Sequence, residues 1–177
     1  MTTHAETHSA RLTYARVAGF AFIFYIAAGI FSMSLPDGSP IVDAFGLLLN
    51  LSALVLGVTL YMLTREHGPA LALLALACRA LEAVHEQSPI FFSIGSLLFC
   101  WLLLRGRMIP ITLAWLGVAA SALLIVILPL QLAEVIPGAG WASSATWMIW
   151  MPMLVFELAL ALWLLVKGVA APQIIAV

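Results

Sequence analysis

The sequence has very few charged residues. Only 8% of its 177 residues are Asp, Glu, Lys or Arg, whereas 64% are hydrophobic and the mean hydropathy is +1.15. A soluble domain carries about 25% charged residues. So few charges leave too little polar surface to cover a globule in water. The composition therefore excludes a water-soluble fold and predicts an integral membrane protein.

Basic residues and paired cysteines are also scarce. Seven Lys and Arg against eight Asp and Glu give a net charge of −1, which excludes a nucleic-acid partner because no basic surface is available. The two cysteines, Cys78 and Cys100, lie inside apolar stretches and are expected to be buried packing residues. No disulfide framework or cofactor is predicted, since paired cysteine spacings and nucleotide motifs are lacking. No metal site is predicted either, because His4 and His8 lie in a terminal segment and His85 has no second histidine in the membrane.

Long apolar stretches dominate what is present. A transmembrane helix needs about 20 mainly apolar residues, and lipid-exposed backbone must be hydrogen-bonded within its own segment. The sequence therefore predicts an all-α polytopic membrane protein, a six-transmembrane-helix bundle occupying residues 11–168 between a polar tail (1–10) and a C-terminal tail (169–177). The six predicted spans are about 17–34, 41–64, 70–87, 90–104, 110–132 and 147–166.

The basic residues fall on one side of this arrangement. Lys and Arg in short loops mark the cytoplasmic side of a membrane protein. Six spans place six of the seven basic residues on that side and none in the outer turns, which predicts that both termini are cytoplasmic. These residues are Arg11, Arg16, Arg65, Arg105, Arg107 and Lys167.

Arg79 is the exception. It lies about ten residues into the third predicted span, which at about 1.5 Å per residue places it about 15 Å deep, near the bilayer centre. Arg at a helix centre costs about 2.5 to 3.5 kcal/mol or more, so its side chain is expected to face the bundle and to have a partner. Glu157, in the sixth span, and Asn50, in the second, are expected at the same level.

A polar cluster near mid-membrane is therefore predicted. It consists of Arg79, Glu82, Glu157 and Asn50, and it opens outward through His85, Glu86 and Gln87. One arginine neutralises one carboxylate, so one of the two buried glutamates is expected to hold a proton near neutral pH, to donate it, or to bind a cation. The candidate catalytic residues are Glu82, Glu157 and His85, and the candidate ligand-binding residues are Arg79, Asn50 and Glu86.

A purely structural interpretation uses the same residues. Arg79 and Glu82 have the spacing of an ion pair within one helix. Glu157 would then be a buried hydrogen-bonding group that joins the third and sixth spans. Both interpretations stay open at this point.

Three segments are similar to one known family. Residues 15–19 (ARVAG), 78–83 (CRALEA) and 156–168 (FELALALWLLVKG) resemble the bacterial domain-of-unknown-function family 4386. The Arg-x-x-Glu pair and the Glu before the final Leu- and Trp-rich run match its pattern. The resemblance implies a small multi-pass protein of the bacterial inner (cytoplasmic) membrane, and it brings no activity with it.

Three classes of function follow. The favoured one is binding of, or acid catalysis on, a small lipophilic molecule of alkene, isoprenoid or quinone-like type that enters from the bilayer. A proton-coupled transporter would use the same carboxylates as a relay. An accessory subunit of a larger membrane complex, or a homo-oligomer, would use the cluster only structurally. No nucleophile triad or phosphate loop indicates a hydrolase, a kinase or an ATP-driven protein.

Overall fold

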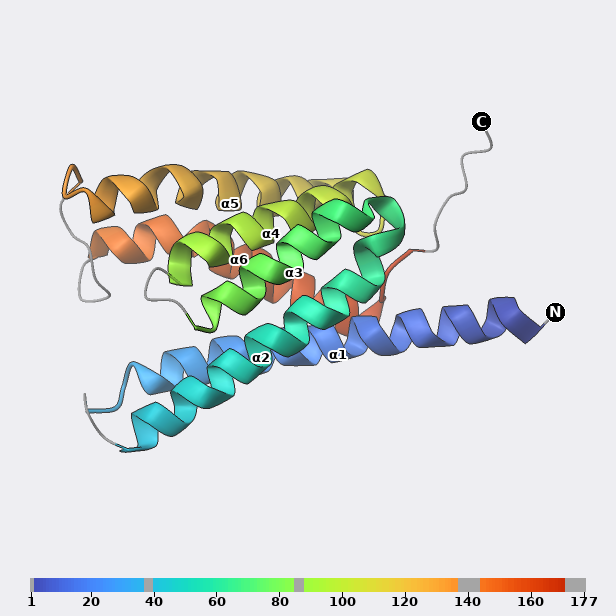
Figure 1. The fold of residues 1–177 in the computed structure, drawn as a ribbon, viewed down its shortest axis with the longest axis horizontal. Helices are drawn as coiled ribbons and strands as arrows, with labels where there is room; N and C mark the ends of the chain where they lie inside the picture. The colour runs from blue at the N-terminus through green and yellow to red at the C-terminus, as the bar shows by residue number, and fades with distance from the viewer. Residues whose placement is uncertain (1, 37–39, 85–87, 137–143, 171–177) are drawn as a thin grey trace.

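The computed structural model describes residues 2–36, 40–84, 88–136 and 144–170, and all regular elements in these residues are helices (Figure 1). This confirms the predicted all-α class. The elements are α1 (Thr2–Ser32), α2 (Pro40–Thr64), the short 3-10 helix η1 (Arg65–His67), α3 (Pro69–Glu82), α4 (Ser88–Arg105), α5 (Ile111–Leu132) and α6 (Ser144–Val166).

Four of the described helices are long and apolar enough to cross a membrane. They cover Ser9–Ser32, Pro40–His67, Ile111–Leu132 and Ser144–Val166. The helix α4 is apolar but shorter. The helix α1 begins earlier than expected, because residues predicted as a polar tail already belong to it.

The helix α3 is shorter than its predicted span. It has 14 residues and ends at Glu82, whereas the predicted span reached Gln87. At about 1.5 Å per residue it is about 21 Å long, less than the hydrocarbon thickness of about 30 Å. The backbone N–H groups of Ala83 and Val84 bond to carbonyls three residues earlier, which tightens the last turn and ends the helix. The extension to residue 87 was therefore wrong for Ala83 and Val84, and residues 85–87 lie outside the described part.

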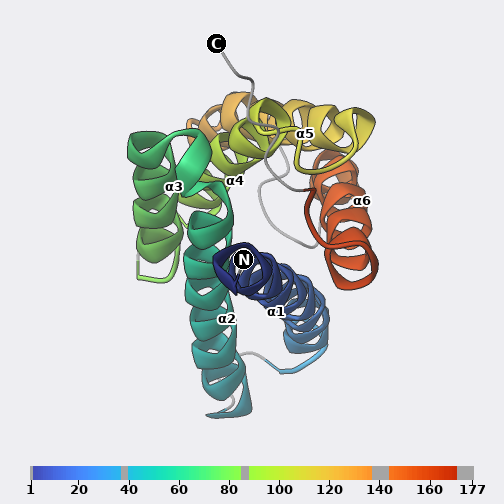
Figure 2. The same cartoon turned by 90° about the vertical axis from the view of Figure 1, so that its right-hand side faces the viewer.

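The helices form a closed ring. Each packs against the next along the chain, and α6 packs against α1 (Figure 2). Successive helices run in opposite directions, so α1 begins and α6 ends at the same end of the bundle (Figure 1). We call this the termini end. The opposite end, where α1, α3 and α5 finish and α2, α4 and α6 begin, is called the pocket end.

Glycines allow close helix contacts at the places that hold α3. A Cβ added at Gly57 of α2 would lie 3.0 Å from the Cβ of Arg79, and one at Gly95 of α4 would lie 3.2 Å from the Cβ of Cys78. Small residues let helix backbones approach closely where no hydrophobic effect drives them together. The helix α3 is thus held between α2 and α4, and this contact fixes the position of Arg79.

Candidate functional site

Arg79 is buried and ion-paired at the end of α3. Its side chain is 3% exposed, and its Nη1 lies 2.8 Å from Oε2 of Glu82, whose side chain is 6% exposed. The two residues are three positions apart on one helix, so the helical repeat itself brings the charges together. Arg79 also lies in the last turn of α3, where a positive charge interacts favourably with the helix dipole. The predicted partner of Arg79 is therefore found on its own helix.

Two aromatic rings flank the guanidinium. Its central carbon lies 5.8 Å from the ring centroid of Tyr25 on α1 and 5.1 Å from that of Phe92 on α4. Cation–π contacts of this kind contribute about 0.5 to 2 kcal/mol each, most when water is excluded. Among the described residues Nε and Nη2 of Arg79 have no hydrogen-bond partner. The two rings therefore contact the face of the guanidinium, whereas Glu82 contacts only its Nη1.

Tyr25 contacts the second carboxylate oxygen of Glu82. Its hydroxyl donates a hydrogen bond of 3.0 Å to Oε1 of Glu82, while Oε2 faces Arg79. Both carboxylate oxygens of Glu82 are therefore engaged. Tyr25 was not among the predicted site residues, although the sequence contains one signal for it: a tyrosine hydroxyl deep in an apolar helix needs a buried partner, because lipid offers none.

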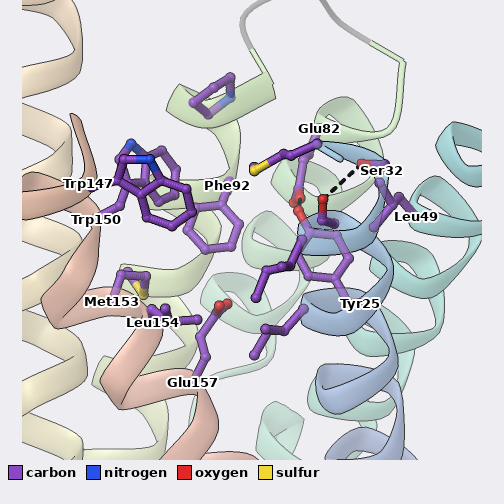
Figure 3. A pocket seen from close by; sticks show the side chains of 15 residues that line it. Tyr25, Ser32, Leu49, Glu82, Phe92, Trp147, Trp150, Met153, Leu154 and Glu157 are labelled. Atoms are coloured by element: carbon purple, nitrogen blue, oxygen red, sulfur yellow. Dashed lines mark hydrogen bonds between the residues drawn. The ribbon is translucent and has the colours of Figure 1, made fainter. Parts of the chain in front are cut away.

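Glu157 differs from Glu82 in having no such partners. It lies on α6, is 7% exposed, and makes no hydrogen bond or ion pair with any described residue. Its carboxyl group interacts electrostatically with Arg79 and Glu82, so α6 brings a second carboxyl group near the arginine. Figure 3 shows the Glu157 carboxyl group pointing into the same space as Glu82 and Tyr25.

That space is a pocket of about 440 Å³ between α1, α4 and α6 at the pocket end (Figure 3). Apolar and aromatic side chains form most of its wall, and the carboxyl groups of Glu82 and Glu157 are its charged groups. The lining residues are Tyr25, Ile26, Gly29, Ile30, Ser32, Met33, Leu49, Glu82, Pro89, Phe92, Trp147, Trp150, Met153, Leu154 and Glu157.

Asn50 does not join this cluster. It is exposed on α2 and does not line the pocket. The α2 residue beside Arg79 is Gly57, which lies seven residues, or about 10 Å, closer to the termini end. The helix α3 continues for only three residues past Arg79, so it ends before the level of Asn50 and cannot cover it. The expected level of Asn50 was therefore wrong.

The remaining predicted residues give no further geometry. His85, Glu86 and Gln87 lie outside the described residues, so their proposed place at the mouth of the cluster stays a prediction. Cys78 and Cys100 are both free and buried, as expected for packing residues. Trp147 and Trp150, two of the tryptophans in the sixth predicted span, line the pocket. The Trp150 ring centroid lies 5.5 Å from that of Phe92.

Comparison with known proteins supports the resemblance found in the sequence. The family described as a domain of unknown function (DUF4386) matches residues 86–168, which include α4, α5, α6 and Glu157. Of the three resembling segments, 156–168 lies within the match, while 15–19 and 78–83 precede it. Neither the curated proteins nor the solved structures contain a match to the chain.

Proposed function

We propose that this chain, whose residues 86–168 match a family of unknown function, binds a small lipophilic molecule in the pocket and presents an acidic side chain to it. Glu157 is the group that faces the ligand. Glu82 is the group that positions Arg79 and Tyr25, because both of its oxygens are already engaged.

The size and wall of the pocket fit such a ligand. Pockets for small molecules have volumes of about 300 to 1,000 Å³ and are mostly apolar with a few polar groups, and a volume of about 440 Å³ lies in that range. Three lining residues keep a large exposed fraction: Ile30 is 49% exposed, Met33 45% and Trp147 38%. Ile30 lies on α1, Met33 directly follows α1, and Trp147 lies on α6, so we place the entrance between these two helices, where lipid would surround them.

The unpartnered carboxyl group of Glu157 is the observation that carries the proposal. A structural role accounts for Arg79, Glu82 and Tyr25, since Glu82 forms an ion pair with Arg79 and accepts a hydrogen bond from Tyr25. It does not account for Glu157, because a buried carboxyl group without a hydrogen-bond partner costs about 1 to 3 kcal/mol even when it is protonated. A ligand that contacts Glu157 offsets this cost when it binds. Acid catalysis on an alkene or quinone-like ligand would use the same carboxyl group as the proton donor.

The orientation proposed for the protein follows from its charges. Arg65, Arg105 and Lys167 lie at the ends of helices that finish at the termini end (Figure 1). The positive-inside rule then supports a multi-pass protein of the bacterial inner membrane, with the termini end in the cytoplasm and the pocket in the outer half.

Two glycine substitutions test whether the pocket is occupied. Gly29 lines the pocket, and a Cβ added there would have only Leu49 Cδ2 within 4 Å, at 3.9 Å. Gly46 on α2 has nothing within 4 Å and is not a lining residue. The phenylalanine of Gly29→Phe would fill the pocket, whereas Gly46→Phe adds the same side chain elsewhere.

The measurement is solvent extraction of the purified protein, followed by mass spectrometry of the small molecules retained. We expect a lipophilic compound from the wild type and from Gly46→Phe, and at least about tenfold less from Gly29→Phe, a loss that corresponds to about 1.4 kcal/mol of binding energy. Equal amounts in all three proteins, or no retained compound, would contradict the proposal and would favour a structural subunit.

A further inference from the structure

We propose that the ligand has a positively charged, amine-like head group that binds the Glu157 carboxylate, joined to an apolar body that fills the rest of the pocket. This inference rests on the proposed function and specifies the chemical class of the ligand.

The charges around the pocket do not balance. Among the described residues that line it, Glu82 and Glu157 are acidic and none is Lys or Arg. Arg79 lies behind this wall, ion-paired with Glu82 at 2.8 Å and flanked by the rings of Tyr25 and Phe92. One buried cation therefore stands against two buried carboxyl groups, and the cation is held by Glu82. An ammonium ligand would supply the counter-charge that the ionised form of Glu157 lacks in the described wall, and would favour that form over the protonated one.

The low polarity of the site strengthens this preference. Two opposite charges attract each other far more strongly in an apolar interior than in water. A buried carboxylate and an ammonium group also form a charge-assisted hydrogen bond, which is about twice as strong as a neutral one. An anionic head group, such as that of a fatty acid, would instead meet two acidic groups and no free cation in the wall.

Aromatic side chains provide the second element of recognition. Phe92, Trp147 and Trp150 line the pocket together with Glu157. The faces of aromatic rings attract organic cations, and aromatic rings commonly surround quaternary ammonium ligands in their binding sites. The exposed lining residues Ile30 and Met33 lie on the α1 side, where an apolar body would lie.

Three probes with the same chain and different head groups test the inference. Octylammonium, octan-1-ol and octanoate are each added to the purified protein in a non-ionic detergent, and the thermal unfolding midpoint Tm is measured. We expect octylammonium to raise the Tm of the wild type by at least about 3 °C, because a ligand that binds only the folded state stabilises it. Octanol should raise it less, and octanoate not at all.

Substitutions of glutamate separate binding at Glu157 from binding to the micelle. The variant Glu157→Gln keeps the shape of the side chain and removes its charge, so octylammonium should no longer raise the Tm. Glu157→Asp keeps the charge and should retain at least part of the rise. Glu66→Gln removes a glutamate at the termini end, which is 56% exposed, and should leave the rise unchanged.

The outcomes distinguish this inference from the proposed function. One outcome is that octanol raises the Tm as much as octylammonium does, that Glu157→Gln changes neither rise, and that Gly29→Phe abolishes both. In that case the ligand pocket is supported and the cationic head group is wrong. If Gly29→Phe abolishes neither response, the pocket itself is not the binding site and both proposals fall.

Discussion

The described residues form two Arg–Glu ion pairs, one at each end of the bundle, with the same chemistry in different surroundings. At the pocket end Arg79 and Glu82 are 2.8 Å apart, and their side chains are 3% and 6% exposed. At the termini end Arg11 and Glu66 are 3.3 Å apart, and their side chains are 16% and 56% exposed. The first pair is buried on both sides, whereas the glutamate of the second pair is exposed to solvent.

The comparison shows that burial decides what an ion pair does. An exposed pair contributes about 0 to 1 kcal/mol, because solvent screens it and the side chains lose freedom. A buried pair adds little by itself, but each charge then depends on the other, since neither can return to water. At the pocket end, removing either Arg79 or Glu82 should therefore destabilise the protein, because the other charge stays buried. Glu157, the second buried acid there, has no hydrogen bond or ion pair with the residues that the structure describes.

The largest expected effect is that of Arg79→Met. It leaves Glu82 buried beside Tyr25 with no counter-charge, which should lower the free energy of unfolding by about 3 to 5 kcal/mol. Equilibrium unfolding of the purified protein in detergent measures this loss. The double variant Arg79→Met/Glu82→Met replaces both charges by apolar groups and should regain most of the stability. If Arg79→Met lowered the free energy of unfolding no more than Glu66→Gln does, burial would not explain a difference between the two ion pairs.

A smaller effect is expected for Tyr25→Phe. The change removes the hydroxyl that donates to Glu82 at 3.0 Å and leaves the ring that flanks Arg79. Because hydrogen bonds to charged groups contribute about 1.5 to 3 kcal/mol, the free energy of unfolding should fall by about that amount. Tyr61→Phe is the matched control, since the Tyr61 hydroxyl has no hydrogen bond with a described residue. Equal losses in the two variants would contradict the role given to the Tyr25 hydroxyl.

The smallest effect is expected for Glu66→Gln. Its carboxylate is more than half exposed, so losing the contact with Arg11 should change the free energy of unfolding by less than about 1 kcal/mol. Raising the salt concentration should reduce even this difference, because exposed charges are screened. If the free energy of unfolding fell by about 3 kcal/mol or more and the change did not depend on salt, the Arg11–Glu66 pair would have to be as buried as the Arg79–Glu82 pair.

The position of most helices could be predicted from the sequence. Apolar stretches bounded by Pro, Gly and charged residues predicted α2, α4, α5 and α6 to within three residues at each end, because lipid forces such stretches to be helical. The end of α1 was also predicted closely, but its start was not, because its first residues are polar. The end of α3 could not be found this way. Ala83 and Val84 give no stop signal, and the helix ends where Glu82 is held by Arg79 on its own helix and by Tyr25 on α1.

The candidate site was predicted in part for a related reason. The pair Arg79–Glu82 depends on spacing within one helix, which a sequence shows directly. The contact of Tyr25 with Glu82 joins residues 57 positions apart, and it depends on which helices pack together. Asn50 was misplaced because its level was counted along α2 alone, whereas the length of α3 decides what covers it. The depth of a residue can be estimated from its position along one helix, but the sequence does not show which helices pack against each other.

Photolabelling tests most directly whether lipophilic molecules enter the pocket. An alkyl diazirine is photolysed with the protein in its membrane, and the labelled residues are mapped by mass spectrometry. Met153 lines the pocket but is only 1% exposed, whereas Leu47 on α2 is 72% exposed. We predict labels on both residues in the wild type, and in Gly29→Phe the loss of the Met153 label with that of Leu47 unchanged. Labels confined to exposed residues such as Leu47, with none on the pocket wall, would contradict the account.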